Sequence, residues 1–348
     1  MTANQDEPKN IKDLGKFGLI RHLTKQVKIR NEQTVSGIGD DAAVIDSPGN
    51  QLLVTTDLLL EGIHFDLMYT PLKHLGYKAV VIGISDVLAM NGFPTQVLIS
   101  VGISQKFSLE QLEDLYEGIN LACEKYQVDF AGGDTASSLT GLTINVTAVG
   151  TVVSEKKAGR EGASVNEIIC VTGDLGGAYM GLQLLEREKE VFKSAPGSQP
   201  DLSGYEYILE RQLKPEARKD VIRYLNKVDV VPTSMIDVSD GLASDLLHLC
   251  HRSGLGCKIF QEKIPIHKNT EKMAGTFDID LLTAALNGGR DYELLFTIPA
   301  NDFDKLKEQE EINPIGHMTS PEFGCYMITT SDHEIELRSP GWDGFKKE

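Results

Sequence analysis

The chain has 348 residues, of which 41% are hydrophobic and 24% are charged. This length and composition are typical of a globular protein with about two domains. The formal net charge of −17 argues against nucleic acid or an anionic membrane surface as the main partner, because both carry negative charge themselves. The first ten residues lack the apolar segment of a signal peptide, and no run approaches the ~18 apolar residues of a membrane span.

The cysteines indicate the redox environment of the protein. There are five of them, they form no CxxC pair, and most have apolar neighbours: Cys123, Cys170, Cys250, Cys257 and Cys325. An odd number without metal-binding spacing favours reduced, buried thiols. Such thiols are typical of a cytoplasmic protein, and we expect that location.

The first half of the chain is predicted to form an α/β domain. Its expected strands are at residues 51–56, 95–103 and 142–153, and its expected helices are at residues 17–24, at 71–90 and after Ser108. Ser108 and Gln111 have the spacing of a capping box. The helix that follows is predicted to have one apolar face, made of Leu109, Leu112, Leu115, Ile119 and Cys123. Gly76 and Gly83 weaken the prediction for the helix at 71–90.

The charged, glycine-containing segment 154–166 is the best candidate for a domain boundary. We therefore expect one domain at residues 1–153 and a second α/β domain at residues 154–348. The second half is predicted to contain strands at 168–171, 234–238 and 292–298, helices at 215–225 and around Leu242–Leu249, a helix entered from Thr172, and a loop at 190–204.

Acidic residues are concentrated in the segment from Gly37 to Phe65, which places Asp40, Asp41 and Asp57 around a short apolar strand. No Lys or Arg lies near them in the sequence. Adjacent carboxylates repel each other, so their closeness usually needs a cation unless solvent screens them. A hard divalent ion with oxygen ligands is the natural candidate.

Similar acidic sites recur along the chain, mostly after a β-rich segment and next to Gly, Ser or Thr: Asp86 in ISD, Asp134 in GGDT, and Asp237 and Asp240 in DVSDG. Carboxylates from separate segments that meet across a cleft could hold two or more Mg²⁺ ions against a polyphosphate, as phosphoryl transfer requires. The glycine turn at Gly132–Gly133 could bind a phosphate through backbone amides. The alternative is structural, because Asp is common at turns and helix N-caps, and we assign Asp174 and Asp245 to that class.

Generic motifs do not identify the reaction. The sequence contains no GxxxxGK[ST] loop and no combination of a kinase glycine loop with HRD and DFG. These motifs therefore predict a metal–phosphate site of unspecified kind.

Six motifs in order carry a specific resemblance: GIGDDAAV, TTDLLLEGIHF, GYKAVVIGISDVLAMNGFP, FAGGDT, MIDVSDGL and GGRDYELLFT. They resemble the thiamine-monophosphate kinase family, from about Leu14 to Gly341. That family belongs to a superfamily with aminoimidazole ribonucleotide synthetase, selenophosphate synthetase and a hydrogenase-maturation protein. The resemblance implies two α/β domains with mixed sheets, a homodimer formed through the N-terminal sheets, and an active site in the cleft between the domains.

The resemblance also implies a reaction, namely direct in-line transfer of the ATP γ-phosphate to thiamine monophosphate without a phosphoenzyme. The transfer would be supported by Asp57, Asp134 and Asp240. The implied Mg²⁺ ligands are Asp40, Thr55, Thr56, Asp57, Asp86, Asp134, Asp237 and Asp240. The implied ATP contacts are Tyr116, Gly133, Asp134, Arg160 and Ser239. The implied substrate contacts are His64, Arg290 and Trp342, the last offering an aromatic face to the cationic thiazolium.

The sequence departs from the family pattern in the last motif, which usually reads GGEDYEL and has Arg290 here in place of the first Glu. A positive charge beside a cationic ring should weaken binding unless Arg290 turns away, pairs with Asp291 or contacts the substrate phosphate. Gly83 and Gly344 replace an Asn and a His that are common in the family. None of these changes removes an implied metal ligand.

Two alternatives stay open. The first is another ATP-dependent enzyme of the superfamily. Selenophosphate synthetase is disfavoured because no cysteine lies near the N-terminal glycine-rich region, and the hydrogenase-maturation protein is disfavoured because the chain has no C-terminal cysteine tail. The second is a non-catalytic sensor of nucleotide or thiamine phosphate.

Overall fold

The structure is a computed structural model that describes most of the chain: residues 18, 20, 24, 25, 27–195, 200 and 202–338. The predicted helix at 17–24 lies largely outside the described residues, as do Trp342 and Gly344.

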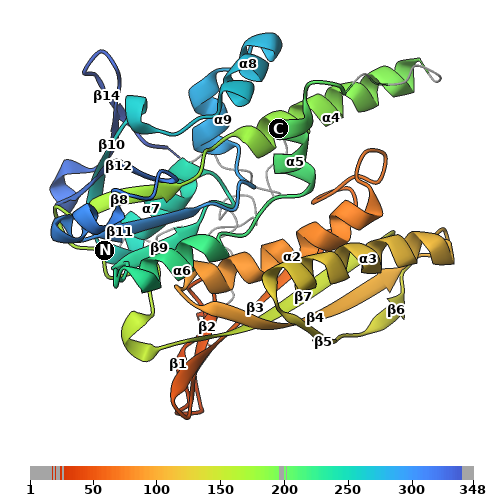
Figure 1. The fold of residues 1–348 in the computed structure, drawn as a ribbon, viewed down its shortest axis with the longest axis horizontal. Helices are drawn as coiled ribbons and strands as arrows, with labels where there is room; N and C mark the ends of the chain where they lie inside the picture. The colour runs from red at the N-terminus through yellow and green to blue at the C-terminus, as the bar shows by residue number, and fades with distance from the viewer. Residues whose placement is uncertain are drawn as a thin grey trace, which may run out of the picture.

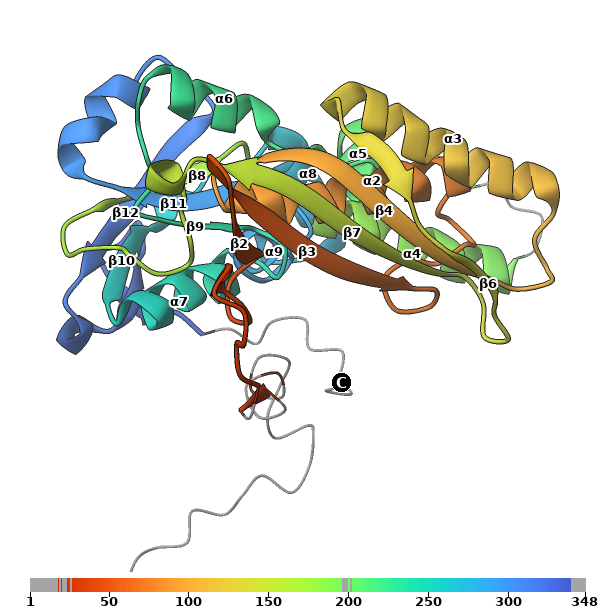
Figure 2. The same ribbon diagram turned by 90° about the horizontal axis from the view of Figure 1, so that it is seen from below.

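The first sheet is built from the N-terminal half of the chain (Figures 1 and 2). Its strand order is β1-β2-β3-β7-β4-β5, and β6 also pairs with β4. The strands are β1 (Thr34–Ser36), β2 (Ala43–Ser47), β3 (Asn50–Leu60), β4 (Phe93–Ile103), β5 (Asp129–Gly132), β6 (Thr135–Ser137) and β7 (Thr143–Val152). Parallel and antiparallel pairs occur together, so the sheet is mixed as expected.

The second sheet contains strands from the C-terminal half in the order β14-β13-β10-β12-β8-β11-β9 and is also mixed. The strands are β8 (Ile168–Thr172), β9 (Ser234–Asp237), β10 (Gly256–Phe260), β11 (Leu294–Ile298), β12 (Ile312–Thr319), β13 (Cys325–Ile328) and β14 (Glu334–Glu336). The helices of this half are α4 (Gly177–Ser194), α5 (Glu206–Leu213), α6 (Lys219–Lys227), α7 (Leu242–Ser253), α8 (Lys268–Phe277) and α9 (Leu281–Asn287). Short 3-10 helices lie at Ser154–Lys156, Gln261–Lys263, Ala300–Leu306 and Pro321–Phe323.

Two helices, α2 (Leu72–Ala89) and α3 (Leu109–Tyr126), cover one face of the first sheet (Figure 1). They approach closely because glycines lie at their contact. A Cβ on Gly76 would lie 2.0 Å from the Leu115 carbonyl oxygen, and a Cβ on Gly118 would lie 1.8 Å from the Lys73 carbonyl oxygen. Gly83 has the same role against the sheet, where a Cβ would meet Val146 Cγ1 at 2.8 Å. These glycines therefore permit close packing despite their low helix propensity.

The capping box of α3 is confirmed, because the Ser108 hydroxyl accepts from the Gln111 amide and the Gln111 side chain accepts from the Ser108 amide. Leu115, Ile119 and Cys123 face the core, but the prediction for Leu109 was wrong, since 68% of its surface is exposed. Leu109 is the first residue of the helix, so it lies beyond the end of the buried stripe.

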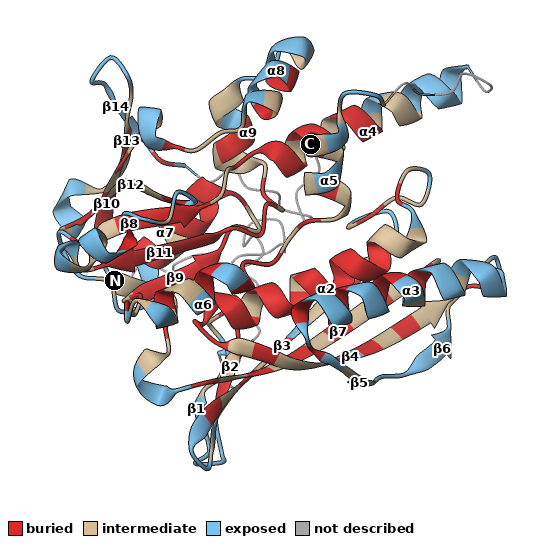
Figure 3. Ribbon diagram, viewed as in Figure 1, coloured by how far each residue is buried: buried red, intermediate tan, exposed pale blue. Residues whose placement is uncertain are grey.

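The strands separate into two sheets on either side of residues 153–167, whereas the buried core continues across this segment (Figure 3). The side chains of Val221, Ile222 and Leu225 on α6 belong to the same apolar cluster as α2 and α3. The division at residue 153 stays a prediction. None of the helices in the part of the chain that the structure describes combines the length and apolar composition needed to span a membrane.

Some predicted boundaries were wrong. Helix α4 continues to Ser194, into the predicted loop at 190–204, and α6 begins at Lys219 instead of residue 215.

Candidate active site between the two sheets

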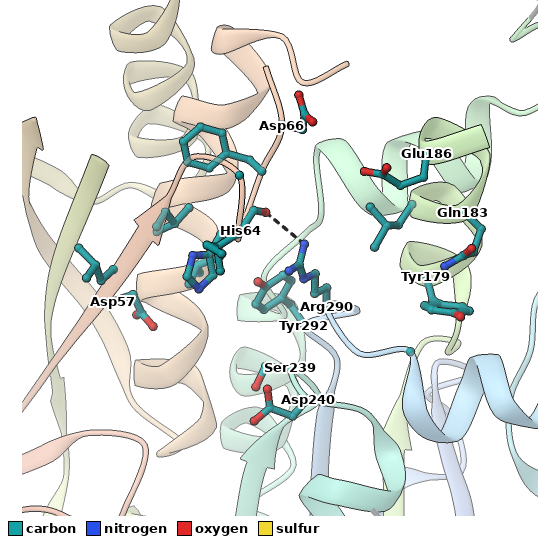
Figure 4. Close-up of a pocket in the computed structure, with 18 of the residues that line it drawn as sticks. Asp57, His64, Asp66, Tyr179, Gln183, Glu186, Ser239, Asp240, Arg290 and Tyr292 are labelled. Carbon is teal, nitrogen blue, oxygen red and sulfur yellow. Dashed lines mark hydrogen bonds between the residues drawn. The ribbon is translucent and has the colours of Figure 1, made fainter. Parts of the chain in front are cut away.

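A cleft of about 650 Å³ lies between the two halves of the molecule (Figure 4). Its walls come from the end of β3 and the loop that follows, from α2 and α4, from the turn between β9 and α7, and from the segment between α9 and β11. The predicted site residues Asp57, His64, Asp86, Asp237, Ser239, Asp240 and Arg290 all line it.

The inner end of the cleft is an acidic cluster that joins both halves of the chain. Oxygens of Asp41, Asp86 and Asp237 all lie within 4.8 Å of one another. Two hydrogen bonds fix the cluster: the Thr55 hydroxyl donates to Asp86 Oδ2 at 2.5 Å, and the Ser85 hydroxyl donates to Asp237 Oδ2 at 2.6 Å. The second bond connects α2 directly to the end of β9.

Burial and mutual repulsion disfavour ionisation in this cluster. Burial raises the pKa of Asp86 well above its usual value, and the charges of Asp57, Asp237 and Asp41 raise it further. Burial also raises the pKa of Asp41 and Asp237, although the Arg160 guanidinium opposes this for both. A divalent cation would relieve these costs, and a set of carboxylate and hydroxyl oxygens suits Mg²⁺. The residues present therefore fit the implied metal.

Arg160 neutralises part of the cluster. Its Nε and one terminal nitrogen donate to the two oxygens of Asp41 at 3.1 and 2.5 Å, and its backbone amide donates to Asp40 Oδ1 at 3.0 Å. A Cβ at Gly159 would lie 2.6 Å from Asp40 Oδ2, so a larger residue there would displace the Asp40 carboxylate. No Lys or Arg is near Asp40 and Asp41 in the sequence, but the fold places Arg160 beside them. Arg160 is 119 residues beyond Asp41 in the chain, so the sequence alone did not reveal this partner.

The turn that carries Ser239 and Asp240 is stabilised by hydrogen bonds to the Asp245 side chain. Asp245 Oδ2 accepts from the backbone amides of Asp240 and Gly241 at 3.2 and 3.1 Å. Gly241 has a φ of 110°, a backbone conformation that favours glycine. Asp245 thus has the structural role that we expected, and Asp174 likewise accepts a hydrogen bond from the Tyr207 hydroxyl at 2.6 Å.

Other predicted residues lie away from the cleft. Asp57, Val146 and Ile99 are successive cross-strand partners on β3, β7 and β4, and Gly133 follows β5 beside Ile99. Three strand spacings of ~4.8 Å place Gly133 roughly 14 Å from Asp57 across the sheet.

Asp134 is exposed at this far edge, next to Gly133. Tyr116 lies there too, because its ring contacts that of Phe130 on β5 with centroids 6.0 Å apart. The side chain of Thr56 points to the opposite face of the sheet from Asp57, where its hydroxyl lies 3.2 Å from that of Thr147. The structure therefore does not bring these four residues into the acidic cluster of the same chain.

The outer part of the cleft contains the predicted substrate residues His64 and Arg290. Arg290 Nη1 donates to the His64 carbonyl oxygen at 3.1 Å (Figure 4). His64 Nδ1 accepts from the Leu60 amide at 3.0 Å. The φ angles of Arg290 and Tyr292 are 62° and 53°, which is uncommon for residues other than glycine and directs both side chains to the cleft.

Asp291 and Glu293, which alternate with Arg290 and Tyr292, are buried and fix this strained segment in place. Asp291 accepts from the amides of Gly176 and Ala178 at 2.8 and 3.2 Å, so it caps the N-terminus of α4. Glu293 accepts from Arg211 at 2.9 Å and from Arg218 at 2.7 Å. Since the Asp291 carboxylate is engaged by α4, we discard the suggested pairing of Arg290 with Asp291.

Helix α4 forms a wall of the cleft that sequence reasoning missed. Tyr179, Gln183 and Glu186 line it at a helical spacing (Figure 4). Glu186 accepts from the Tyr69 hydroxyl at 2.6 Å, which links the wall to the loop after β3. The sequence offered a helical pattern after Thr172 but nothing to show that this face lines a site.

Comparisons with known proteins agree with this arrangement. Residues 39–152 match the family model described as AIR synthase related protein, N-terminal domain. The thiamine-monophosphate kinase of Aquifex aeolicus is 34% identical over 88% of this chain and 92% of its own length. The chain belongs to the thiamine-monophosphate kinase family. The Bacillus subtilis member is 31% identical over 96% of this chain and all of its own length.

Solved structures of the family have the same fold. The structure of AaThiL complexed with AMPPCP and TMP has a TM-score of 0.83 and 31% identity, covering 97% of this chain and 99% of that one. The HypE–HypF complex contains a chain with a TM-score of 0.69 and 17% identity, which shows a shared fold only. The AIR synthase-like fold expected from the sequence is therefore confirmed.

Proposed function

We propose that this member of the thiamine-monophosphate kinase family transfers the ATP γ-phosphate to thiamine monophosphate and forms thiamine diphosphate. One observation carries the proposal: carboxylates from both halves of the chain converge at the inner end of a cleft large enough for two small ligands. Membership of the family and the likeness to AaThiL complexed with AMPPCP and TMP support the two substrates.

Mg²⁺ would be held by Asp86 and Asp237 of the acidic cluster together with Asp40, Asp57 and Asp240, with the Thr55 hydroxyl beside them. Bound Mg²⁺ supplies positive charge against the β- and γ-phosphate oxygens, which is the main electrostatic requirement of phosphoryl transfer. These ligands include residues of β3, α2 and the β9–α7 turn, and the hydrogen bond from Ser85 to Asp237 joins the two halves. Ser239 lines the cleft beside Asp240, and we assign its hydroxyl as a donor to a phosphate oxygen of ATP.

The outer part of the cleft suits the second substrate. Arg290 lies between the acidic cluster and the wall formed by α4, and we assign its guanidinium to the phosphate of thiamine monophosphate. Tyr69, Tyr179 and Tyr292 offer aromatic faces to the cationic thiazolium, and Glu186, which is ion-paired with Lys189, lies near them. This assignment removes the conflict between Arg290 and a cationic ring.

The acceptor in this reaction is a phosphate oxygen that is already anionic, so the transfer needs no protein nucleophile and no strong general base. The protein's contribution is to orient the two phosphates in line and to keep their charges balanced. His64 contributes through its backbone carbonyl, which orients the Arg290 side chain. Trp342 lies outside the described residues, so its stacking on the thiazolium stays a prediction.

We further propose a homodimer formed through the open face of the first sheet. That face is only partly buried and exposes Leu58 and Leu98, at 51% and 38%, beside Thr56. In such a dimer, Tyr116, Gly133 and Asp134 at the far edge of the sheet would complete the ATP and metal site of the partner subunit. Their distance from Asp57 in the same chain supports this arrangement. The cytoplasmic location stays a prediction.

The test is a product assay with ATP, thiamine monophosphate and Mg²⁺, in which thiamine diphosphate and ADP are separated and measured. The proposal predicts both products in equal amounts and no product in the presence of a chelator. ADP without thiamine diphosphate would indicate another enzyme of the superfamily. Binding of thiamine monophosphate without any turnover would indicate a sensor, and either result overturns the proposal.

A further inference from the structure

Three of the five cysteines meet in the C-terminal half. Cys250 lies on α7, Cys257 on β10 and Cys325 on β13, and their sulfurs all lie within 4.8 Å of one another. Cys250 and Cys257 are buried, whereas Cys325 is partly exposed. No cysteine occurs among the described residues that line the cleft, so this cluster is separate from the proposed active site.

The sheet register explains how residues so far apart in sequence come together. Cys257 is the parallel cross-strand partner of Cys325 and the antiparallel partner of Met318 on β12. Cross-strand partners point to the same face of a sheet, so two thiols and a thioether lie side by side. Helix α7 packs on this face and adds Cys250, and all four side chains belong to one apolar cluster. The result is a group of three thiols with the Met318 side chain beside them on the same face of the sheet.

The three sulfurs are close enough together to share one ion, and Cys325 is the one that solvent can reach. Its partial exposure leaves a route for a small ion from solvent. A buried thiol that only fills the core needs neither feature, because free cysteine otherwise behaves as a small apolar side chain.

We propose that Cys250, Cys257 and Cys325 form a binding site for one thiophilic d¹⁰ metal ion, Zn²⁺ or Cu⁺, with the Met318 thioether as a further donor. Metal–sulfur bonds form as each thiol loses its proton to solvent, and no oxidation is involved. Tetrahedral Zn–S bonds of ≈2.3 Å place the sulfurs about 3.8 Å apart, so the cluster needs only a small contraction. The acidic cluster has hard oxygen ligands and this one has soft sulfur ligands, so the two sites select different ions.

A metal here would have a structural consequence for the cleft. Cys250 is near the C-terminal end of α7, and the N-terminal end of the same helix follows the turn with Ser239 and Asp240. Bonds from Cys250 to two strands would fix α7 on the second sheet. Because the ion binds only the folded chain, it would also raise the melting temperature.

The test uses the full, reduced chain with excess Mg²⁺, so that the acidic cluster is already occupied. Co²⁺ is added as a probe for Zn²⁺, because thiolate–Co²⁺ bonds give near-ultraviolet charge-transfer absorption that oxygen ligands do not give. In a second arm, Cu⁺ is offered from its complex with a chromogenic chelator. The proposal predicts about one ion per chain in at least one arm, and the arm identifies the ion. Absence of the absorption band together with no withdrawal of Cu⁺ overturns it.

Matched variants separate a site from a general effect on folding. Cys257→Ala should abolish the signal, whereas Cys170→Ala, which also removes a fully buried thiol from a strand of the same sheet, should retain it. Cys325→Ser keeps the size of the partly exposed side chain and should also lose the signal. This variant provides the test if Cys257→Ala fails to fold. A signal that survives Cys325→Ser, or that Cys170→Ala reduces equally, refutes the assignment.

Discussion

Replacing Asp86 by Asn removes one charge from the acidic cluster with almost no change in side-chain size. The asparagine carbonyl can still accept the hydrogen bond from the Thr55 hydroxyl. Oxygens of the carboxylates in this cluster lie within 4.8 Å of one another, and two unit charges at that separation repel by about 3.5 kcal/mol at an effective dielectric constant of ~20. Asp86 has two such neighbours, Asp41 and Asp237, and Arg160 compensates only part of this charge.

Protonation sets an upper limit to the cost that Asp86→Asn removes. The unfolded carboxyl ionises near pH 3.8, and its pKa in the folded chain is raised well above that value. At about pH 7.5 and without metal, Asp86 in the folded chain is either ionised and repelled by its neighbours or protonated. Protonation costs at most about 5 kcal/mol at this pH, so the cost to stability cannot be larger. This cost is absent below pH 3.8 and grows as the pH rises. Allowing for relaxation, we expect a gain of about 2 kcal/mol and a melting temperature roughly 3 °C higher.

The assay is thermal unfolding in chelator and in Mg²⁺, at about pH 5 and pH 7.5. Asp86→Asn should raise the melting temperature in chelator, more at the higher pH, and should abolish both the Mg²⁺-dependent stabilisation and turnover. Asp174→Asn is the control, because that carboxylate binds Tyr207 and lies outside the cluster. A lower melting temperature in chelator, with a normal response to Mg²⁺, would show that Asp86 has a structural role instead.

Other contacts give further tests. Gly159→Ala would place a methyl group 2.6 Å from Asp40 Oδ2, and titration calorimetry should show Mg²⁺ binding weakened about tenfold; unchanged affinity would remove Asp40 from the ligand set. Glu293→Gln breaks the buried ion pairs with Arg211 and Arg218 and should lower the free energy of unfolding in urea by about 3–5 kcal/mol; a loss below about 1 kcal/mol would contradict a buried network. Arg290→Ala should raise KM for thiamine monophosphate at least about tenfold with a smaller fall in kcat; an unchanged KM would place the substrate phosphate elsewhere.

The elements that local signals define were predictable from the sequence. The capping box at Ser108 and the strand pattern of β3 are examples, because both depend on residues a few positions apart. The recurring Asp motifs also indicated Asp86 and Asp237 correctly as members of one cluster. Helix α5 was missed because its eight residues are too few to show a helical period, and it is stabilised by packing against α4.

Contacts between distant segments could not be predicted from local patterns. The bidentate pairing of Arg160 with Asp41 crosses 119 residues. The charged sequence at Arg290–Glu293 suggests an exposed or substrate-binding segment, yet Asp291 and Glu293 are buried. Their burial depends on the amides of α4 and on Arg211 and Arg218, which no local pattern connects to them. The same limitation hid the three-cysteine cluster, whose members come from a helix and two strands.

The central claim is that carboxylates from both halves of the chain bind divalent metal together with the nucleotide. It is tested most directly by titrating Mn²⁺ into the chain with a non-hydrolysable ATP analogue and measuring bound Mn²⁺ by electron paramagnetic resonance. We predict tight binding that Asp57→Asn, in the first sheet, and Asp237→Asn, in the second, each abolish, while Asp174→Asn leaves it intact. Mn²⁺ binding that persists in either cluster variant would contradict the account.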